Sequence, residues 1–400
     1  MRSHDTDILV VGAGVAGCAA ALVLGEHHSV TLVDRVEALV PRIGESLPGA
    51  ATPLLHRLGL LERFETAGHR HSLGKASAWG SKLLVRRDSF TDPAGPGWCL
   101  DRVRFDTMLR DAARERGVRL MAPASLIGLT RQSDGTGGWH ALLRSADADI
   151  ALDTRFVVLA HGRSAPPAAL DPPLKVQASD RLVCRFVRMP SSSPATMQTG
   201  FSVIEAVQEG WWYQTTLPDG QRLFAYHTDA DLPSARQACH AEGFAALLHA
   251  THALDVAPIP PDVPIGRASA RSQRPDRPCG TDWCAVGDAS CAFDPLSSQG
   301  LFHALYTGVR GAEAAIVAMR GDNRALAAYG GRVAQITDAY SRNLRRFYAL
   351  ETRFRDNPFW ARRRHQSESS VAPRSVLVEL SRNAGRAVPR FEAQATLRQA

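Results

Sequence analysis

Residues 7–34 read DILVVGAGVAGCAAALVLGEHHSVTLVD, and this stretch decides the fold expected of the chain. Residues 8–11 are an apolar run typical of a buried strand, a glycine-rich turn follows, and residues 18–24 have the composition of a buried helix. A second apolar strand over residues 30–33 ends on an acid, Asp34. This order of strand, glycine turn, helix, strand and acid predicts a βαβ unit that binds a dinucleotide.

Each glycine of the turn has a physical role. Gly12 allows a tight turn, Gly14 lets backbone N–H groups approach a pyrophosphate, and Gly17 lets the helix pack close to the strand. The free N–H groups and positive dipole end of the helix favour the two phosphates, and the terminal carboxylate can accept hydrogen bonds from a ribose. An ordinary strand–helix turn is the alternative, but it would not require every part of the unit. The residues expected to contact the dinucleotide here are Gly12, Gly14, Ala16, Gly17, Asp34 and Arg35.

The composition is that of a soluble globular protein of two or three domains. Its 400 residues are 44% apolar and 22% charged, which is ordinary for such a protein. No apolar run reaches the roughly 20 residues that cross a bilayer, and the first strand starts directly after the N-terminus. We therefore expect a cytoplasmic protein with no signal peptide and no membrane span. The seven cysteines include no CxxC pair, which predicts buried, reduced thiols and no metal site.

The formal net charge is +7, and much of it lies near the end of the chain, at Arg345, Arg346, Arg353, Arg355 and 362–364. A solvated basic face is the simpler interpretation of these arginines, and docking of an acidic partner is the functional one. Nucleic-acid binding is disfavoured because no recognised module accompanies the charge.

The order of patterns along the chain predicts an α/β protein, α+β overall, with three parts. A Rossmann-like nucleotide-binding domain carries an inserted antiparallel β-sheet domain, and a C-terminal helical segment follows. Pro-rich linkers near residues 166–173 and 258–264 support the insertion. We assign residues 1–75, 97–172 and 265–320 to the nucleotide domain, residues 76–96 and 173–264 to the inserted sheet, and residues 321–400 to C-terminal helices and a basic tail.

The inserted sheet offers an aromatic wall. Residues 211–213 read Trp-Trp-Tyr within one of its expected strands. Trp211, Trp212 and Tyr213 could line a substrate pocket, although core packing of the sheet is the alternative and must hold for at least one alternating position.

Two further segments have the look of ligand-binding loops. Residues 41–48 read PRIGESLP, and their glycine and prolines shape a loop in which Arg42, Glu45 and Ser46 could face a ligand or only brace the chain. The strand at 283–286 ends at Gly287-Asp288, where ligands sit in open α/β sheets. Residues 294–300, DPLSSQG, then lead into an apolar helix expected from Leu301.

Four pieces in this order resemble the flavoprotein hydroxylase superfamily: the glycine turn, Leu100-Asp101-Arg102, Gly287-Asp288 and Pro295-x-x-x-x-Gly300 before a helix. The resemblance covers residues 6–320 and implies FAD as the cofactor, with the inserted sheet as the substrate domain. It implies that Asp288 binds the ribityl chain and that Arg102 lies near the flavin phosphates. The start of the last helix would face the flavin edge that becomes negative on reduction. The implied flavin-facing residues of this segment are Pro295, Ser298, Gln299, Gly300 and Leu301.

The chain is more closely similar to the tryptophan-halogenase-like branch, through GESLP, GWWY, LPDG and DPLSSQG. Two departures stand out. Halogenases of this branch carry a lysine just before a Leu-Gly pair and a glutamate before the flavin helix. Here Ser72 precedes Leu73-Gly74, with Lys75 after the pair, and Ser297 takes the place of the acid. Because no lysine and acid are then positioned to carry hypohalous acid, the departures favour a monooxygenase over a halogenase.

Within that branch, the motifs most resemble the flavoproteins of cysteine tryptophylquinone biogenesis. These include the tryptophan-hydroxylating maturation flavoprotein of quinohemoprotein amine dehydrogenase and its amino-acid-oxidase counterparts. The resemblance implies that reduced FAD and O₂, through a C4a-hydroperoxyflavin, hydroxylate a tryptophan side chain of a small acidic protein. Hydroxylases that use NADPH directly usually have an Asp-Gly pair where this chain has His161-Gly162-Arg163. FAD would thus be reduced either by NAD(P)H directly or by a separate flavin reductase.

The residue that assists the chemistry is left open among Glu45, His303, Lys75 and His161. Each could remove a ring proton or polarise an indole N–H. A core histidine and a solvated strand lysine are the favoured alternatives for His303 and Lys75, whereas the shaped loop favours Glu45. The rival functions are a halogenase or hydroxylase of a free aromatic molecule, a geranylgeranyl-reductase-like flavoprotein, and a non-catalytic FAD-containing chaperone for an immature partner.

Overall fold

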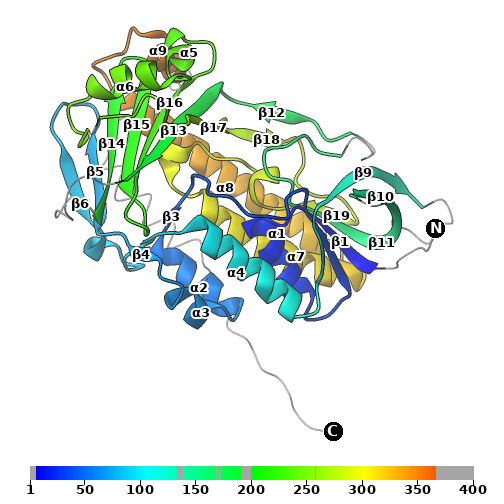
Figure 1. Cartoon of the computed structure of the whole chain (residues 1–400). Coiled ribbons are helices and arrows are strands. Elements are labelled where there is room, and N and C mark those ends of the chain that lie inside the picture. Colours follow the sequence, from blue (N-terminus) through cyan, green and yellow to red (C-terminus); the bar gives the residue numbers. More distant parts are fainter. Residues whose placement is uncertain are drawn as a thin grey trace.

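Two β-sheets of seven strands each lie at opposite ends of the computed structural model, and long helices connect them (Figure 1). The structure describes residues 6–132, 138–146, 148–167, 170, 173–190, 200–256 and 258–365. The predicted fold class, a Rossmann-like α/β unit with a second sheet and C-terminal helices, is confirmed. The basic tail expected beyond residue 365 lies outside the described residues.

The first sheet contains the βαβ unit. Its order is β8–β2–β1–β11–β10–β9, with β19 also paired to β11. The pairs β8–β2, β2–β1, β1–β11 and β11–β19 are parallel, and the β9–β10–β11 meander is antiparallel. The strands are β1 (Thr6–Val11), β2 (Val30–Val33), β8 (Arg119–Met121), β9 (Ala124–Arg131), β10 (Trp139–Ser145), β11 (Asp149–Leu159) and β19 (Trp283–Ala285).

Alternate residues of β1 enter different cores. Ile8 and Val10 pack with the helices on one face, whereas Leu9 packs with Trp139 on the other. All ten residues of α1 are buried, and a Cβ on its Gly17 would lie 1.8 Å from the Gly12 carbonyl oxygen, so the helix can approach the turn only with glycine there. The helices of this half are α1 (Val15–Leu24), α2 (Thr52–Arg57), α3 (Leu61–Glu65), α4 (Arg102–Glu115) and α7 (Gly300–Met319).

The second sheet has the order β17–β13–β16–β15–β14–β5–β6. Its strands are β5 (Gly74–Ala78), β6 (Val85–Asp88), β13 (Leu182–Met189), β14 (Phe201–Val207), β15 (Gly210–Thr216), β16 (Arg222–Asp229) and β17 (Gly266–Ser269). The prediction of an antiparallel sheet is wrong for one pair, since β5 runs parallel to β14. No hairpin joins these two strands, so no short turn forces them to be antiparallel. Also, β17 pairs with β13 in this sheet, although the assignment from residue 265 onward was to the nucleotide domain.

The long helix α8 (Arg324–Ala349) contributes to both halves. Leu326, Tyr329 and Val333 join the core of the first half, and Tyr348 joins a core on the second sheet with Trp360 of α9 (Pro358–His365). The opposite face of the second sheet is covered by α6 (Ala241–His249), preceded by α5 (Pro233–Gln237). Three short strands, β3 (Ser46–Leu47), β4 (Arg70–His71) and β7 (Trp98–Cys99), form a small sheet, and β12 (Val176–Ala178) pairs with β18 (Gln273–Pro275). Among the described helices, none is long and apolar enough to cross a membrane.

Candidate active site

Two adjoining cavities lie between the two sheets. The inner cavity, about 380 Å³, runs from the glycine turn to the second sheet. The outer cavity, about 220 Å³, lies between β5, β6, residues 46–50 and α8. Both are lined by Ser46, Ile204 and Ser298, so these three residues mark where the cavities meet.

The glycine turn opens onto the inner cavity. Gly14 and Ala16 line it, and a Cβ on Gly14 would meet no atom within 4 Å, so space for a ligand faces the start of α1. The four N-terminal N–H groups of a helix and its dipole favour phosphate at such a position. Gly12 and Gly17 shape the turn from behind. This end of the cavity therefore fits a dinucleotide phosphate.

Arg102 lies on the first turn of α4, at the same end of the inner cavity. Its Nη1 donates to the carbonyl oxygens of Ile43, at 3.2 Å, and Gly44, at 2.7 Å, and its Nη2 donates to Asp106 at 3.2 Å. Its Nε is buried without a partner, and so are both ring nitrogens of His161. Burial lowers the pKa of His161, so its ring is neutral. These unsatisfied groups beside the cavity fit a polar ligand such as FAD.

Asp34 and Arg35 do not line either cavity. Asp34 accepts from the backbone N–H of Ala13 at 2.6 Å and lies 3.2 Å from Nη2 of Arg110. Arg35 is exposed and donates to Ser164 Oγ at 3.1 Å. The Asp34 carboxylate is thus already bonded to the glycine turn and to Arg110, and these contacts compete with the predicted contact to a ribose. Sequence reasoning missed Arg110, although it lies two turns after Arg102 on the same helix face.

Like Arg102, Arg42 lines the inner cavity, and it lies in the loop before β3. Its guanidinium pairs with Asp106, the same carboxylate that Arg102 contacts. Both guanidinium groups can donate to an anionic ligand at this end of the cavity, and Asp106 and Glu45 are the acids close to Arg102.

Asp288 follows β19 and also lines the inner cavity. Its carboxylate lies 3.1 Å from Nε of Arg163, whose Nη2 donates to the Phe293 carbonyl at 2.7 Å. Burial raises the pKa of Asp288, and the charge of Arg163 opposes this. Asp288 is thus placed to accept a hydrogen bond from a ligand hydroxyl. Arg163 was not predicted as a site residue because only the fold brings it to Asp288.

The segment before α7 separates the two cavities. Pro295, Ser298, Gly300 and Leu301 line the inner cavity, and Ser297 and Gln299 line the outer one. Ser298 has a φ of +51°, a left-handed conformation that is costly for a residue with a side chain. The segment ends with the N-terminus of α7 directed at the inner cavity, where its dipole stabilises negative charge.

The predicted aromatic wall divides between the two faces of its sheet. Trp211 and Tyr213 line the inner cavity. Trp212 points to the other face, where its ring lies 4.8 Å from that of Tyr226 and 4.9 Å from that of Phe244. The prediction of a substrate contact is therefore wrong for Trp212, because successive side chains of a strand face opposite sides.

Trp211 stacks on a histidine that the sequence reasoning missed. The ring centroids of Trp211 and His227 are 3.7 Å apart and nearly parallel, and both residues line the inner cavity. Burial lowers the pKa of His227 to about 3, so its ring is neutral. Finding His227 would have required the pairing of β15 with β16, which sets the two residues side by side.

A hydrogen-bonded chain continues behind Trp211. Its Nε1 donates to the hydroxyl of Tyr348 at 3.1 Å, and that hydroxyl donates to Oδ2 of Asp294 at 2.7 Å. Burial raises the pKa of Asp294 to about 6. Asp294 lines both the inner cavity and a third, charged cavity that includes Asp180, Arg345 and Arg363.

Of the predicted catalytic residues, Glu45 lines the inner cavity and His303 lines neither cavity. Glu45 is buried, and its Oε2 accepts from the backbone N–H of Gly44 at 2.9 Å. Burial, and then the charge of Glu45, raise the pKa of Tyr213 well above its usual value. His303 is buried on α7 with Nε2 3.2 Å from Ser290 Oγ, and burial lowers its pKa to about 4. The structure thus favours the alternative of a core histidine for His303.

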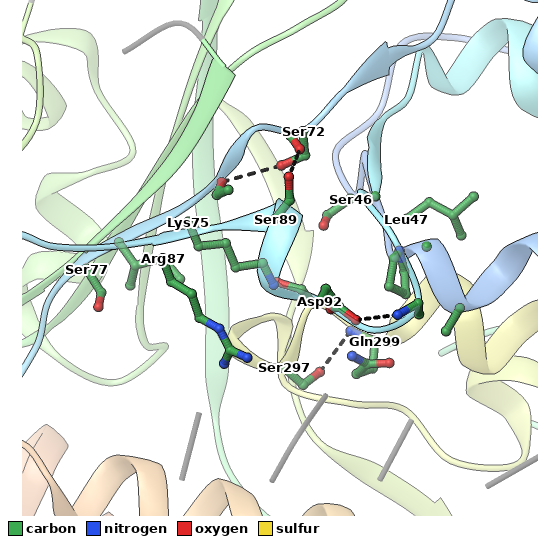
Figure 2. Close-up of a pocket in the computed structure, with 18 of the residues that line it drawn as sticks. Ser46, Leu47, Ser72, Lys75, Ser77, Arg87, Ser89, Asp92, Ser297 and Gln299 are labelled. Atoms are coloured by element: carbon green, nitrogen blue, oxygen red, sulfur yellow. Dashed lines mark hydrogen bonds between the residues drawn. The ribbon is translucent and has the colours of Figure 1, made fainter. Parts of the chain in front are cut away.

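Lys75 lies in the outer cavity, not beside the glycine turn. Figure 2 shows its side chain extending from β5 toward Asp92, with Arg87 beside it. Lys75 is reached by solvent through the cavity, yet the surrounding protein lowers the pKa of its amine by desolvation, against the charge of Asp92. Ser72 and Ser297 line the same cavity.

The cysteines and possible metal ligands form no centre among the residues that the structure describes. No group of three His, Cys, Asp or Glu side chains there could hold a metal ion. All seven cysteines are free, and Cys239 is exposed, contrary to the expectation that every thiol is buried. It lies at the break between α5 and α6.

Comparisons with known proteins show which family the chain belongs to. Residues 72–394 match the family model described as tryptophan halogenase. LodB of Marinomonas mediterranea, which bears the name of an FAD-dependent oxidoreductase, is 28% identical over 380 residues, covering 91% of this chain and 97% of LodB.

Solved structures give the same picture. CmlS, a flavin-dependent halogenase, is 20% identical with a TM-score of 0.79, covering 96% of this chain and 71% of CmlS. QhpG, a peptidyl tryptophan dihydroxylase essential for tryptophylquinone cofactor biogenesis, is 25% identical with a TM-score of 0.69, covering 93% of this chain and 81% of QhpG. Together with the fit of the inner cavity, these matches identify FAD as the cofactor of this oxidoreductase.

Proposed function

Because the chain belongs to the tryptophan halogenase family of FAD-dependent enzymes, we propose that it is a monooxygenase that hydroxylates a tryptophan side chain of a small acidic protein. The product would be an intermediate in the making of a peptidyl quinone cofactor. The similarity to QhpG, at 25% identity over 93% of the chain, supports the peptidyl substrate.

The observation that carries the proposal is the lining of the outer cavity. By the resemblance, Ser72 and Ser297 stand where halogenases of this branch carry a lysine and a glutamate, and both line this cavity. Ser297 Oγ donates to the Asp294 carbonyl at 2.8 Å, and the Ser72 carbonyl accepts from Ser89 Oγ at 2.7 Å. Two hydroxyl-bearing residues here favour oxygen transfer over the capture of an oxidised halide.

Reduced FAD, when bound, supplies the activation of O₂ to an electrophilic oxygen. The chain's own residues position the substrate and move protons. Ile204, where the cavities meet, and Tyr213 can hold an aromatic ring, and Glu45 can accept the indole N–H or the ring proton. Asp294, which has a pKa near 6 and lines the inner cavity, can exchange a proton at Oδ2 with the hydroxyl of Tyr348.

The source of electrons belongs to this proposal as well. His161-Gly162-Arg163 follows β11, and Arg163 is paired with Asp288. This arrangement favours reduction of FAD by a separate flavin reductase over direct use of NAD(P)H. Stopped-flow reduction of the bound flavin by NADPH, compared with reduction by a reductase and free flavin, tests the choice.

Halogenation is a second candidate, and Lys75 favours it. Its amine lies in the outer cavity with a lowered pKa, so it could react with hypohalous acid in place of the missing lysine. The names of CmlS and other relatives also support this function.

One experiment tests both candidates. The FAD-loaded protein would receive reduced flavin and O₂ with N-acetyltryptophan amide, a tryptophan-containing acidic peptide or a phenol, with and without bromide. Oxygen-sized mass gains on the peptide, independent of bromide and lost in Glu45→Gln, support the monooxygenase. Brominated product that disappears in Lys75→Met supports the halogenase. Oxidation of the phenol alone indicates a small-molecule hydroxylase, and consumption of reduced flavin with no product contradicts all three.

A further inference from the structure

The strand β6 is the edge of the second sheet in the part of the chain that the structure describes. It pairs with β5 on one side, in the register Lys75 with Arg87 and Ser77 with Val85. The backbone N–H of Ser89 donates to the Leu73 carbonyl at 2.9 Å. This hydrogen bond shows which residues of β6 direct their backbone groups toward β5. Because alternate residues of a strand bond to the same side, the N–H and C=O groups of Arg86 and Asp88 point away from the sheet.

The side chains around this edge are unusually apolar. Leu83 is 76% exposed, Val85 is 58% exposed and Phe90 is 80% exposed. Sheet edges are normally protected by charge, proline or a covering element, and clustered exposed apolar residues mark interaction sites. Val85 also lines the outer cavity, so this apolar edge lies at the rim of the candidate active site.

The charges along the β6 edge are mostly positive. Lys82 and Arg86 are exposed on the β5–β6 hairpin, and Asp88 is the exposed acid there. Arg87, on the opposite face of β6 from Arg86, lines the outer cavity together with Lys75, Asp88 and Asp92. A strand added along this edge would meet Lys82, Arg86 and Arg87 and one acid of β6, Asp88, and this favours an acidic strand.

We propose that the β6 edge binds an extended, acidic segment of a partner polypeptide as an added strand, so that one of its side chains enters the outer cavity. An added strand would lie about 4.8 Å beyond β6, and every second side chain would point to the face on which Val85 and Arg87 lie. That is the face of the outer cavity. Main-chain hydrogen bonds to the N–H and C=O of Arg86 and to the N–H of Asp88 supply affinity, whereas the Asp88 carbonyl already accepts from Thr91 Oγ1 at 2.8 Å. The cavity selects the side chain. The proposal rests on the proposed function, because the inserted side chain is the one to be oxidised.

Binding is measured apart from turnover, with oxidised FAD-loaded protein and a fluorescent synthetic peptide of alternating Glu and Val around one Trp. Arg86→Pro removes the outward N–H, and Arg86→Ala keeps it while removing the charge and the contact with the Phe201 ring. We expect Arg86→Pro to weaken binding about tenfold more than Arg86→Ala. The peptide should also slow hydrogen exchange in residues 83–90. Arg267→Ala, on the opposite edge strand β17, should bind like wild type, and a peptide with Lys for Glu should bind weakly.

Equal affinities of Arg86→Pro and Arg86→Ala, or unchanged exchange in residues 83–90, would overturn the docking surface. If the Arg86→Pro protein loses its flavin absorbance, the Val85→Glu variant is tested in its place. Its new carboxylate at the rim of the outer cavity should repel the acidic peptide and weaken its binding. Turnover of N-acetyltryptophan amide in the same samples keeps the two proposals apart. If the amide is oxidised but the peptide does not bind, the docking surface is wrong and the proposed function stands. If the peptide binds but neither substrate is oxidised, the proposed function is wrong and the docking surface stands.

Discussion

The hydroxyl of Tyr348 donates to Oδ2 of Asp294 at 2.7 Å, and this contact ties the end of α8 to the segment that precedes α7. It joins a helix from the C-terminal part of the chain to the wall of the inner cavity. Asp294 also accepts from the backbone N–H of Leu296 at 2.9 Å, so one buried carboxylate organises both the turn and the helix contact.

The stability of the protein should depend on pH through Asp294. Burial raises the pKa of Asp294 from 3.8 to about 6, so the folded state holds this proton more tightly than the unfolded state. Its stabilising contribution is complete below about pH 4 and is lost as the pH rises through 6. Relative to Asp294→Asn, wild type should lose roughly 1–2 kcal/mol of unfolding free energy between pH 5 and 7. Urea unfolding at both pH values measures this, and parallel pH profiles would contradict it.

Gly14→Ala and Gly17→Ala should separate cofactor binding from folding. A Cβ on Gly17 would lie 1.8 Å from the Gly12 carbonyl oxygen, so this variant should fail to fold or melt far below wild type. A Cβ on Gly14 meets no protein atom within 4 Å but points into the space expected for the pyrophosphate. Gly14→Ala should therefore keep the melting temperature of the FAD-free protein and bind FAD weakly. Normal FAD affinity in Gly14→Ala would argue against the assigned phosphate position.

The adjacent tryptophans should respond differently to substitution. Trp212 is fully buried between Tyr226 and Phe244, so Trp212→Leu should cost about 3 kcal/mol of stability and leave the flavin spectrum unchanged. Trp211→Phe removes the hydrogen bond to Tyr348 in the wall of the inner cavity. It should shift the flavin absorbance and fluorescence with a smaller loss of stability. A spectral shift in Trp212→Leu alone would reverse the assignment of the two faces.

Ser298→Gly should stabilise the fold and impair activity. Ser298 has a φ of +51°, and glycine relieves a left-handed strain of about 1 kcal/mol. The same substitution loosens a residue that lines both cavities. We expect a higher melting temperature together with a lower kcat, measured with any substrate that the protein oxidises. An unchanged melting temperature would mean that the surrounding turn does not strain this residue.

Local patterns were enough to predict the βαβ unit, the strand β19 and the helix α7, because each depends on neighbours along the chain. The presence of the second sheet was predicted, but the order and direction of its strands were not. The parallel contact between β5 and β14, and the place of β17, depend on residues far apart in sequence. The glycine turn, Asp288 and the DPLSSQG segment could be found as motifs.

The remaining parts of the site could not be found in this way. His227 meets Trp211 only through strand register, and Arg163 meets Asp288 only through the parallel pairing of β11 with β19. Arg110 was the exception, because helical spacing from Arg102 would have placed it on the buried face of α4. The outward position of Trp212 could have been predicted. Successive side chains of a strand face opposite sides, so Trp212 must face away from the cavity once Trp211 faces it.

The parallel pairing of β5 with β14 has a consequence for biosynthesis. Ala78 ends β5 and Phe201 begins β14, so the ribosome needs on the order of ten seconds to make the roughly 120 residues between them. During that delay the nascent hairpin of β5 and β6 has a second unpaired edge. Substitutions that make this edge more prone to aggregation should therefore lower the yield of soluble protein in the cell, even where the melting temperature of the folded protein is unchanged.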